Sequence, residues 1–493
     1  MNRKTDHVKV LVIGGGPAGS LTAALLARAG IDVLLLEKEV FPRYHIGEAL
    51  ASSCRSILEL AGAARKVDEF GFVSKHGGLF RWGAEKDWSA DWTELFGDEV
   101  RSWSVDRSEF DHLLLKNAAE QGARVVEGAA VKQVVFEDGR PVAAEWVCQA
   151  DPAEPRRTTF DFVVDASGRA GVLTARHFRN RTKHEVFRNV AIWSYWDGEE
   201  LLPDTPQGGS NIISSPDGWY WVIPLRGGRR SVGFVMHESA FRERRPCYDS
   251  PDDLLAALVD ESDTVRSLLR GDTRLAKARV EQDYSYVSAS FCGPGYFAAG
   301  DAACFLDPLL SSGVHLASYS ALLAAASITA VVDGEVTEQE AAAFYESLYR
   351  NAYTRMLAMV SRMYDQYQGQ ANYFWLAQRL TGTPAAEAVR PNAAFVEIVA
   401  GISDLFDAEH GKRAEHGGAG PDDTAEEAPL DLVEIMPKDL YDDDSRLRLV
   451  TSPRLGLRRE EPAAAGGAAR PPRPATAAES ARDTQGADLT ATR

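Results

Sequence analysis

The chain has 493 residues, 45% of them hydrophobic, and carries a formal net charge of −18 at pH 7. That length and apolar content are sufficient for a large core with two or three packed subdomains. The negative charge argues against nonspecific binding to nucleic acid or to an anionic membrane surface. The five cysteines are scattered and form no CxxC pair, which indicates neither a disulfide framework nor a zinc site and favours a reducing cytoplasm.

The first 40 residues predict a βαβ unit. Val8–Ile13 has the composition of a strand, Gly14–Gly19 of a turn, and Ser20–Ala29 of a helix. Asp32–Leu36 then predicts a second strand, which ends immediately before Glu37.

The turn carries a dinucleotide-binding motif. Gly14 permits a tight turn, Gly16 allows backbone N–H groups to approach a pyrophosphate, and Gly19, after Ala18, packs the helix on the sheet. Glu37 is placed to accept hydrogen bonds from a ribose 2′-hydroxyl. A glycine turn without a ligand is the alternative, but the strand–turn–helix context and the acid together favour a dinucleotide. The motif does not choose between FAD and NAD.

The middle of the chain changes from alternating helices and strands to strands alone. Phe110–Glu120 predicts a helix, and Arg124–Glu127 and Asp161–Asp165 predict strands. From about residue 186 the side chains alternate, and Trp219–Pro224 belongs to this pattern. The pattern predicts an antiparallel sheet with one covered face.

A second glycine-acid pair favours FAD. Tyr296–Ala299 predicts a strand that leads into Gly300 and Asp301, followed by a helix. An acidic group beside a helix N-terminus suits the hydroxyls of a flavin's ribityl chain. A simple helix cap by Asp301 is the alternative.

The C-terminal third predicts helices and then a polar tail. Val314–Val332 is apolar but interrupted by polar residues, which favours a buried helix over a membrane span. Thr337 and Glu340 form a capping box for a long helix through Tyr367. After about residue 407 the composition shifts to Gly, Glu, Asp, Ala and Pro.

Within this polar tail two segments differ. Glu460–Arg493 is of low complexity and predicts disorder. Leu430–Ile435 is a candidate for a short packed segment.

These elements predict a mixed α/β fold. An FAD-binding domain of the aromatic-hydroxylase or glutathione-reductase type would carry an antiparallel substrate sheet and a C-terminal helical region. The predicted boundaries are 1–185 for the first FAD-binding segments, 186–275 for the substrate sheet, 276–334 for the closing FAD-binding segment, 335–408 for the helical region and 409–493 for an acidic, largely disordered tail.

Further stretches combine a lone lysine, paired tryptophans and small residues: Glu37–Arg43 with Ile46–Glu48, Lys75–Gly83, Trp219–Pro224, Asp283–Tyr286 and Gly300–Ala317. Over roughly the first 400 residues the chain resembles flavin-dependent halogenases, in particular the phenol-chlorinating branch of glycopeptide and enediyne antibiotic pathways. The glycine turn and the Gly-Asp pair are shared with many flavin monooxygenases. The Trp-x-Trp-x-Ile-Pro run together with the lysine is specific to halogenases.

The resemblance implies an enzyme that chlorinates an electron-rich phenolic ring, free or tethered to an acyl or peptidyl carrier protein. A separate flavin reductase would supply FADH₂, which with O₂ forms the flavin C4a-hydroperoxide and converts chloride to hypochlorous acid. Lys75 would then relay the oxidant, as a chloramine or by hydrogen bonding. The chloride would be cradled by the backbone N–H groups of Ser312 and Gly313, which is reasonable at a helix start.

The lysine and the tryptophans also have structural interpretations. Lysine suits a relay because burial can lower its pKa, although most lysines are simply solvated. Trp219 and Trp221 point to the same side of a strand because side chains alternate with period 2. They are expected to keep the substrate away from the flavin, so that hydroxylation cannot compete; ordinary core packing is the alternative.

Three further residues follow from the resemblance. Arg43 and Gly47 are expected to bind the cofactor, and Arg107 to brace its phosphates or the strap over it, with a surface salt bridge as the alternative for Arg107. Tryptophan halogenases carry a glutamate where this chain has Leu310. A phenol activates its own ring, so Leu310 favours a phenol over tryptophan, with a pyrrole as a weaker option.

Other residues and functions carry less weight. His45 and His315 lack partners at metal-ligand spacing, and no metal is proposed. Arg242, Arg244 and Arg245 form a solvated surface or, less favoured, a dock for an acidic carrier protein.

The alternative enzyme is an FAD-dependent aromatic monooxygenase, a hydroxylase or epoxidase with its own NAD(P)H handling. A non-catalytic flavin-binding partner of a biosynthetic assembly is the alternative from another class.

Overall fold

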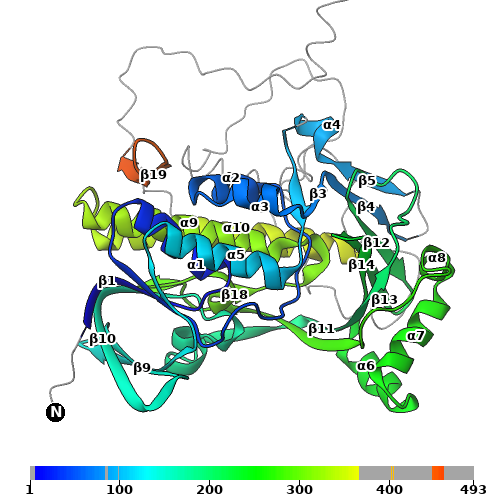
Figure 1. The fold of residues 1–493 in the computed structure, drawn as a ribbon, viewed down its shortest axis with the longest axis horizontal. Helices are drawn as coiled ribbons and strands as arrows, with labels where there is room; N and C mark the ends of the chain where they lie inside the picture. The colour runs from blue at the N-terminus through cyan, green and yellow to red at the C-terminus, as the bar shows by residue number, and fades with distance from the viewer. Residues whose placement is uncertain are drawn as a thin grey trace, which may run out of the picture.

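The computed structural model describes residues 6–83, 87–97, 99–365, 401, 404 and 447–459. Two eight-stranded sheets lie at opposite ends of the molecule, and helices α9 (Ser312–Val332) and α10 (Glu338–Asp365) run from one toward the other (Figure 1). The predicted mixed α/β architecture is therefore confirmed.

The first sheet is mainly parallel. Its order is β16 (Cys292–Gly293), β17 (Tyr296–Ala298), β10 (Asp151–Asp165), β1 (Asp6–Ile13), β2 (Val33–Leu36) and β7 (Arg124–Val126), with β8 (Ala129–Glu137) and β9 (Arg140–Cys148) added through β10. Strand β1 pairs in parallel with both β2 and β10, and β10 with β17. The carboxyl ends of these strands meet at one edge, which is where ligands bind in open α/β sheets.

Apolar helices cover this sheet. Helix α1 (Pro17–Arg28) starts at Pro17 rather than at the predicted Ser20, because proline is well suited to the first helical position. Helix α5 (Arg107–Glu120) likewise begins three residues before the predicted Phe110. Helix α9 is long and apolar enough to cross a membrane, but 18 of its 21 residues are buried inside the protein, as predicted for a core helix.

The second sheet draws on more of the chain than predicted. Its order is β18 (Cys304–Phe305), β15 (Arg279–Ser288), β11 (Arg181–Asp197), β14 (Arg229–His237), β13 (Gly218–Leu225), β12 (Ser210–Ser215), β4 (Gly77–Arg81) and β5 (Trp88–Asp91). Strands β4, β5, β15 and β18 fall outside the predicted 186–275 segment. Their membership depends on long-range pairing, such as the parallel register of β12 with β4, which local composition does not encode.

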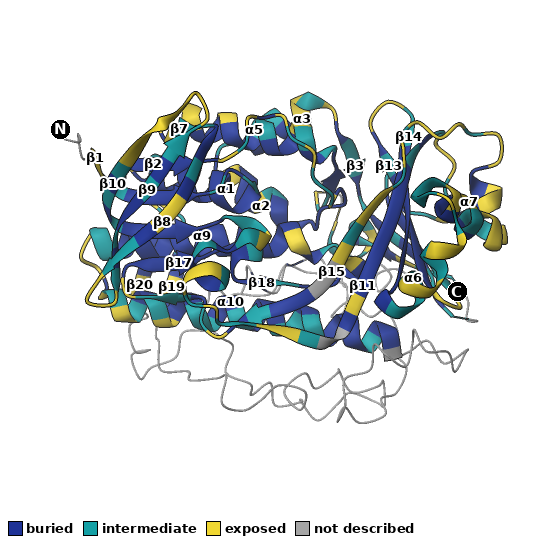
Figure 2. Cartoon of the chain, turned by 90° about the horizontal axis from the view of Figure 1, so that it is seen from below, coloured by how far each residue is buried: buried dark blue, intermediate teal, exposed yellow. Residues whose placement is uncertain are grey.

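The expectation that only one face of this sheet is covered was wrong. Trp193, Trp219 and Trp221 pack into the main core on one face, whereas Tyr220 and Phe234 belong to a second apolar cluster on the other. Helices α6 (Glu238–Arg244), α7 (Pro251–Glu261) and α8 (Asp263–Leu268) lie at this end of the molecule (Figure 1), where Figure 2 shows α6 and α7 beside β11 and β14. Helices α7 and α8 contribute apolar side chains to the second cluster.

The segment after β17 also differs from the prediction. Gly300–Ala302 is a single 3₁₀ turn rather than the start of a helix, and the long helix begins only at Ser312. The intervening residues form β18 and a second 3₁₀ turn, Pro308–Leu310. The predicted capping box of α10 is confirmed, since Thr337 and Glu340 exchange hydrogen bonds. The predicted helix end at Tyr367 lies outside the described residues.

Part of the predicted tail is ordered. Strands β19 (Leu447–Val450) and β20 (Gly456–Arg459) form an antiparallel hairpin whose leucines are buried in the main core, near α9 (Figure 1). The prediction of a largely disordered tail therefore does not hold for residues 447–459. Leu430–Ile435 and Glu460–Arg493 lie outside the described residues. The remaining elements are α2 (Ser53–Leu60), α3 (Ala64–Phe70), β3 (Val73–Lys75), α4 (Trp92–Phe96) and β6 (Ser102–Ser104).

A glycine creates the space for the indoles of the second sheet. Gly233 in β14 is directly opposite Trp193 in β11 and Trp221 in β13. A Cβ atom at Gly233 would lie 2.2 Å from Cζ2 of Trp221 and 2.6 Å from Cβ of Trp193. The two indole rings, with centroids 6.2 Å apart, therefore close over a position that only glycine can occupy.

Replacing this glycine tests the packing. Gly233→Ala is expected to displace the Trp221 indole and to lower the free energy of unfolding by about 1–3 kcal/mol, the usual cost of overpacking a core. Chemical denaturation and the tryptophan emission spectrum measure the two effects. Gly456→Ala is the control, because its nearest neighbour would be 3.5 Å from the new Cβ. A Gly233→Ala protein with unchanged stability and emission would contradict this account.

Candidate active site

One cavity of about 650 Å³ lies at the carboxyl edge of the first sheet and extends to the second sheet. Most of the predicted site residues line it: Gly14, Gly16, Ala18, Glu37, Arg43, Gly47, Arg107, Trp219, Trp221, Gly300, Asp301 and Gly313. Gly19, Ser312 and Lys75 do not line it. Residues spread over 300 positions of sequence thus converge on one space.

The glycine turn forms one end of the cavity. Gly14 has φ +108°, and a Cβ atom there would lie 2.2 Å from the carbonyl oxygen of Ala166. Glu37 is buried, and its two carboxylate oxygens accept hydrogen bonds from the backbone N–H groups of Gly15 (2.6 Å) and Glu39 (2.8 Å). Each oxygen keeps a second lone pair. Glu37 therefore organises the turn itself and retains acceptors for a ribose hydroxyl.

Arg107 fixes the segment that crosses the cavity. Its guanidinium donates to both oxygens of the fully buried Asp111, at 2.8 and 3.1 Å. A third nitrogen donates to the carbonyl oxygens of Ile46 (2.8 Å) and Gly47 (3.3 Å). Asp111 also lies 3.2 Å from Arg43. The alternative of a surface salt bridge is excluded, because Arg107 is buried and its guanidinium bonds to the backbone of residues 46 and 47.

Asp301 has a free carboxylate at the cavity wall. Burial raises its pKa, and Arg169, Arg107 and Arg181 oppose that shift. Among the described residues its carboxylate accepts no hydrogen bond, whereas its backbone carbonyl accepts from Arg181 and from Tyr286. Such an unpartnered acid beside several arginines can accept hydrogen bonds from the hydroxyls of a ribityl chain.

The N-terminus of α9 opens into the same cavity. Ser311, Gly313, Val314 and Ala317 line it, and the first turn of the helix contains no acidic side chain. A Cβ atom on Gly313 would meet nothing within 4 Å. The free N–H groups and the positive end of a 21-residue helix favour a bound anion. Ser312 is buried and does not line the cavity.

The two predicted indoles form a wall on the second sheet. Trp219 and Trp221 line the cavity with ring centroids 6.1 Å apart. The Trp221 ring N–H donates to Ser231 Oγ (3.0 Å), and that of Trp219 donates to the Tyr364 hydroxyl (2.8 Å). Both ring nitrogens are therefore satisfied, and neither indole is available as a hydrogen-bond donor to a ligand.

The wall is connected to the loop before α9. The Tyr364 hydroxyl lies 3.0 and 3.1 Å from the two oxygens of Asp307, which also accept from Asn189. Burial raises the pKa of Asp307 to about 6, against the lowering effect of these donors. This link could not be predicted, because nothing in the sequence relates Trp219 to Asp307.

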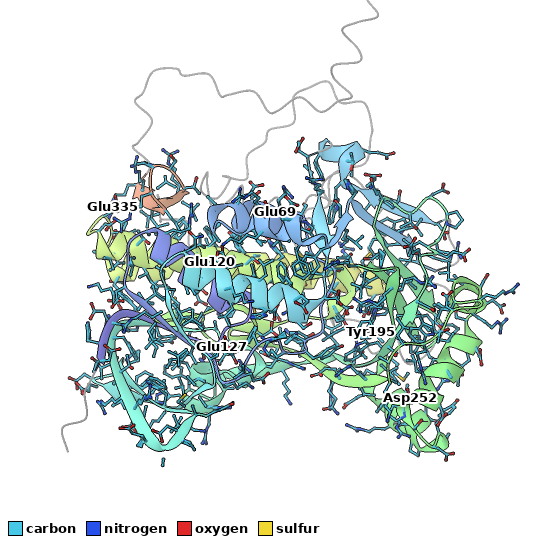
Figure 3. All side chains as sticks on the ribbon, in the orientation of Figure 1. Glu69, Glu120, Glu127, Tyr195, Asp252 and Glu335 are labelled. Atoms are coloured by element: carbon cyan, nitrogen blue, oxygen red, sulfur yellow. The ribbon has the colours of Figure 1, made fainter. Side chains whose placement is uncertain are left out.

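A second acidic group at the cavity was also missed. Glu48 lines the cavity, and its Oε1 atom accepts a hydrogen bond from the Tyr195 hydroxyl (2.7 Å). Tyr195, labelled in Figure 3, lies on β11. The signals in the sequence were the Ile46–Glu48 stretch and the alternation that puts Trp193 and Tyr195 on the same face of a strand.

Lys75 is buried beside the cavity rather than in it. Its side chain ends in the main core region, where Nζ donates to the carbonyl oxygen of Leu50 (3.2 Å) and lies 5.0 Å from the Trp92 ring centroid. Burial lowers its pKa to about 8, and the nearby Cys54 opposes this shift. Leu50 follows Ala49, which lines the cavity. The alternative of a solvated surface lysine is excluded.

Histidine residues serve structural contacts. His315 is buried, and its ring nitrogens lie 2.8 Å from Ser53 Oγ and from Asp404 Oδ2. His45 contacts the carbonyl oxygen of Ile46, and burial lowers its pKa to about 4. In the part of the chain that the structure describes, no group of three His, Cys, Asp or Glu residues could hold a metal ion.

The donor set fits a flavin dinucleotide. The Gly14 turn leaves room only for backbone near a pyrophosphate, the Asp301 carboxylate is free for ribityl hydroxyls, and the α9 N-terminus favours an anion beside the ring system. The indoles of Trp219 and Trp221 form the wall of the cavity at the second sheet. This arrangement separates a cofactor-and-anion chamber from a buried amine.

Comparison with known proteins gives the family. Residues 9–101 and 100–417 match the family model described as tryptophan halogenase. A tryptophan 2-halogenase from Chondromyces crocatus is 41% identical over 417 residues, which are 84% of this chain and 79% of that protein. The sulochrin halogenase gedL from Aspergillus terreus is 37% identical over 74% of this chain and 71% of its own length.

Solved structures agree. The myxobacterial chondrochloren halogenase CndH, an FAD-dependent halogenase, matches with a TM-score of 0.72 and 35% identity over 81% of this chain and 91% of its own. The flavin-dependent halogenase CmlS matches with a TM-score of 0.71 and 33% identity over 76% of this chain and 68% of its own. With the flavin-type cavity described above, these similarities show that the chain belongs to the flavin-dependent halogenases, enzymes that use FAD, chloride and O₂.

Proposed function

We propose that this halogenase chlorinates the ring of a phenol and that Lys75 carries the oxidant from the flavin chamber to the substrate. Reduced FAD, supplied by a separate reductase, provides the activation of O₂ that turns chloride into hypochlorous acid. Chloride binds at the backbone N–H groups of Ser312 and Gly313. Trp219 and Trp221 keep the phenol away from the flavin.

The burial of Lys75 carries this proposal. Burying a lysine costs free energy because the ammonium loses its hydration, and most lysines are solvated, so the buried position of Lys75 favours a function. The lowered pKa of about 8 leaves a usable fraction of the amine neutral, and a neutral amine can attack hypochlorous acid to form a chloramine. Its contact with Leu50, next to the cavity-lining Ala49, supports a short route between the two chambers.

Substitution of the lysine tests the relay. Lys75→Ala is expected to oxidise reduced flavin at the normal rate, because the residue is outside the cavity, and to lose chlorination by at least roughly 10²-fold, the contribution of a positioned catalytic group. Oxygen consumption and chlorinated product are measured together, with reductase and chloride added.

Lys9→Ala is the matched control, since Lys9 is partly exposed and pairs with Asp161. Retained chlorination in Lys75→Ala would remove Lys75 from the mechanism. Rapid NAD(P)H oxidation by the wild-type protein without any reductase would instead favour the aromatic monooxygenase.

The buried amine also predicts a pH-dependent stability. Folding lowers the pKa of Lys75 from 10.5 to about 8, so the fold must hold a buried ammonium below pH 8. That cost is full at pH 7, shrinks as the pH rises from 8, and is absent above 10.5. The effect of Lys75→Met on the free energy of unfolding should therefore be more favourable at pH 7 than above pH 10.5, by about 3 kcal/mol.

Denaturant unfolding at pH 7, 9 and 10.5 measures this difference. Lys9→Met, at a partly exposed lysine, is the control substitution. A Lys75→Met effect that does not change with pH would mean that the amine is solvated in the native protein.

The phenol assignment rests on one position beside the anion site. Leu310 is buried at the end of the 3₁₀ turn that precedes helix α9. Tryptophan halogenases carry at this position a glutamate that acts on the ring. A phenol needs no such group, because its oxygen donates electron density to the ring. The names of similar proteins include both a tryptophan 2-halogenase and a sulochrin halogenase, so they do not decide the substrate.

A substrate panel tests the assignment. The wild-type enzyme is expected to chlorinate simple phenols with a kcat/KM at least tenfold above that for free tryptophan. Each phenolic acid is offered both free and as a carrier-protein thioester, so that the comparison shows whether the enzyme acts on a tethered ring. Arg242 and Arg244, a possible carrier dock, are already paired with Glu238 and Glu261. Preferred turnover of tryptophan would overturn the phenol assignment.

A further inference from the structure

A continuous chain of hydrogen bonds joins two residues that line the cavity, the exposed Tyr44 and the buried Glu48. Tyr44 is 41% exposed, and its hydroxyl lies 2.8 Å from that of Tyr195. The Tyr195 hydroxyl donates to Glu48 Oε1 at 2.7 Å. Glu48 lines the cavity, its carboxyl group is buried, and the Ser231 hydroxyl lies beside it.

The donors in this chain all point the same way. The ring N–H of Trp193 donates to the Tyr44 hydroxyl at 2.8 Å, which leaves Tyr44 free to donate its own proton to Tyr195. Tyr195 in turn donates to Glu48. Each hydroxyl therefore accepts one bond and donates one, which is the arrangement that a stepwise proton transfer toward Glu48 requires.

Chloride oxidation consumes a proton. The overall reaction joins FADH₂, O₂, chloride and one proton to give FAD, hypochlorous acid and water. O₂ takes up four electrons, two from FADH₂ and two from chloride. Of the three hydrogens in the products, two come from FADH₂ and one must come from outside. That proton needs a donor at the place where chloride is oxidised.

We propose that Tyr44, Tyr195 and Glu48 form a proton relay that delivers this proton from the exposed Tyr44 to the buried end of the chain at Glu48, in the flavin chamber. This role rests on the chloride oxidation proposed above. Glu48 gives a proton to the cavity and is reprotonated on Oε1 by Tyr195, which takes a proton from Tyr44, which takes one from solvent. Glu48 is the donor at the cavity, and the two tyrosines act through it.

The surrounding charges allow Glu48 to exchange a proton near neutral pH. Burial raises its pKa to about 7, the Ser231 and Tyr195 hydroxyls and Arg107 lower it, and Asp106 raises it. Asp106 is paired with Arg229 at 2.8 Å, and Arg107 is paired with Asp111.

The tyrosine end of the relay has its own neighbours. The Arg279 guanidinium carbon lies 3.6 Å from the Tyr44 ring centroid. Burial raises the pKa of both tyrosines, so neither becomes a phenolate and both pass protons as neutral hydroxyls. His45, with its pKa lowered to about 4, is neutral at pH 7 and adds no charge.

Two substitutions break the relay at different points. Glu48→Gln keeps the shape and the acceptor for Tyr195 but has no proton to give, and chloride oxidation at pH 7 should fall roughly 10²-fold. Tyr195→Phe cuts the supply to Glu48 and should lower the rate by roughly 10-fold or more. Both variants should bind FAD with unchanged affinity. Tyr220→Phe is the control, because Tyr220 is a buried tyrosine whose hydroxyl bonds to Leu258 on the other face of the sheet.

Two further measurements separate a relay from a structural role. In the FAD-free protein, one component of the infrared carbonyl band of protonated carboxyl groups should titrate with a midpoint near pH 7, and that component should be absent in Glu48→Gln while the component from Asp307 remains. Glu48→Ala leaves room for formate, and its halogenation rate should rise with formate concentration at constant pH, whereas that of the wild-type enzyme should not.

The relay is overturned if Glu48→Gln and Tyr195→Phe keep the wild-type rate and pH profile, or if their only defect is weaker FAD binding. Failure of the proposed function is a separate result: the wild-type enzyme with reductase, chloride and O₂ would give no chlorinated product. The infrared titration does not depend on that product.

Discussion

The buried ion pair between Arg107 and Asp111 holds the segment on which every part of the site depends. Arg107 reaches from α5 to the carbonyl oxygens of Ile46 and Gly47, and Asp111 also faces Arg43. The residues that follow supply Glu48 to the cavity wall and the Leu50 carbonyl to Lys75. A single stretch of eight residues therefore borders the flavin chamber on one side and the buried amine on the other. Gly47, with φ +108° and only 2.8 Å between a Cβ atom and Arg107, makes this close approach possible.

The parts of the site that were predicted from sequence are those encoded by local spacing. The glycine turn, Glu37, the alternation of Trp219 and Trp221, and the capping box of α10 depend on residues within a few positions of one another. Their chemistry is fixed by backbone geometry, so the pattern alone indicates it.

The parts that were not predicted arise from pairing between distant segments. Strand β4 joins β12 across 130 residues, and Trp219 reaches Asp307 only through Tyr364. Glu48 and Tyr195 are likewise 147 positions apart. The Gly300–Ala302 turn was mistaken for a helix start because Gly-Asp-Ala-Ala has the composition of one, whereas the neighbouring β18 strand draws the chain away.

The hairpin of β19 and β20 has a practical consequence for handling the protein. Leu447, Leu449 and Leu457 enter the main core near α9, and Arg454 and Arg459 form ion pairs with Asp333 and Glu340 at the end of that helix and the start of the next. Composition suggests shortening the chain near residue 408, which would remove this apolar cover and leave the far end of the central helix exposed to solvent. A trimmed version for crystallisation should therefore keep everything up to Arg459.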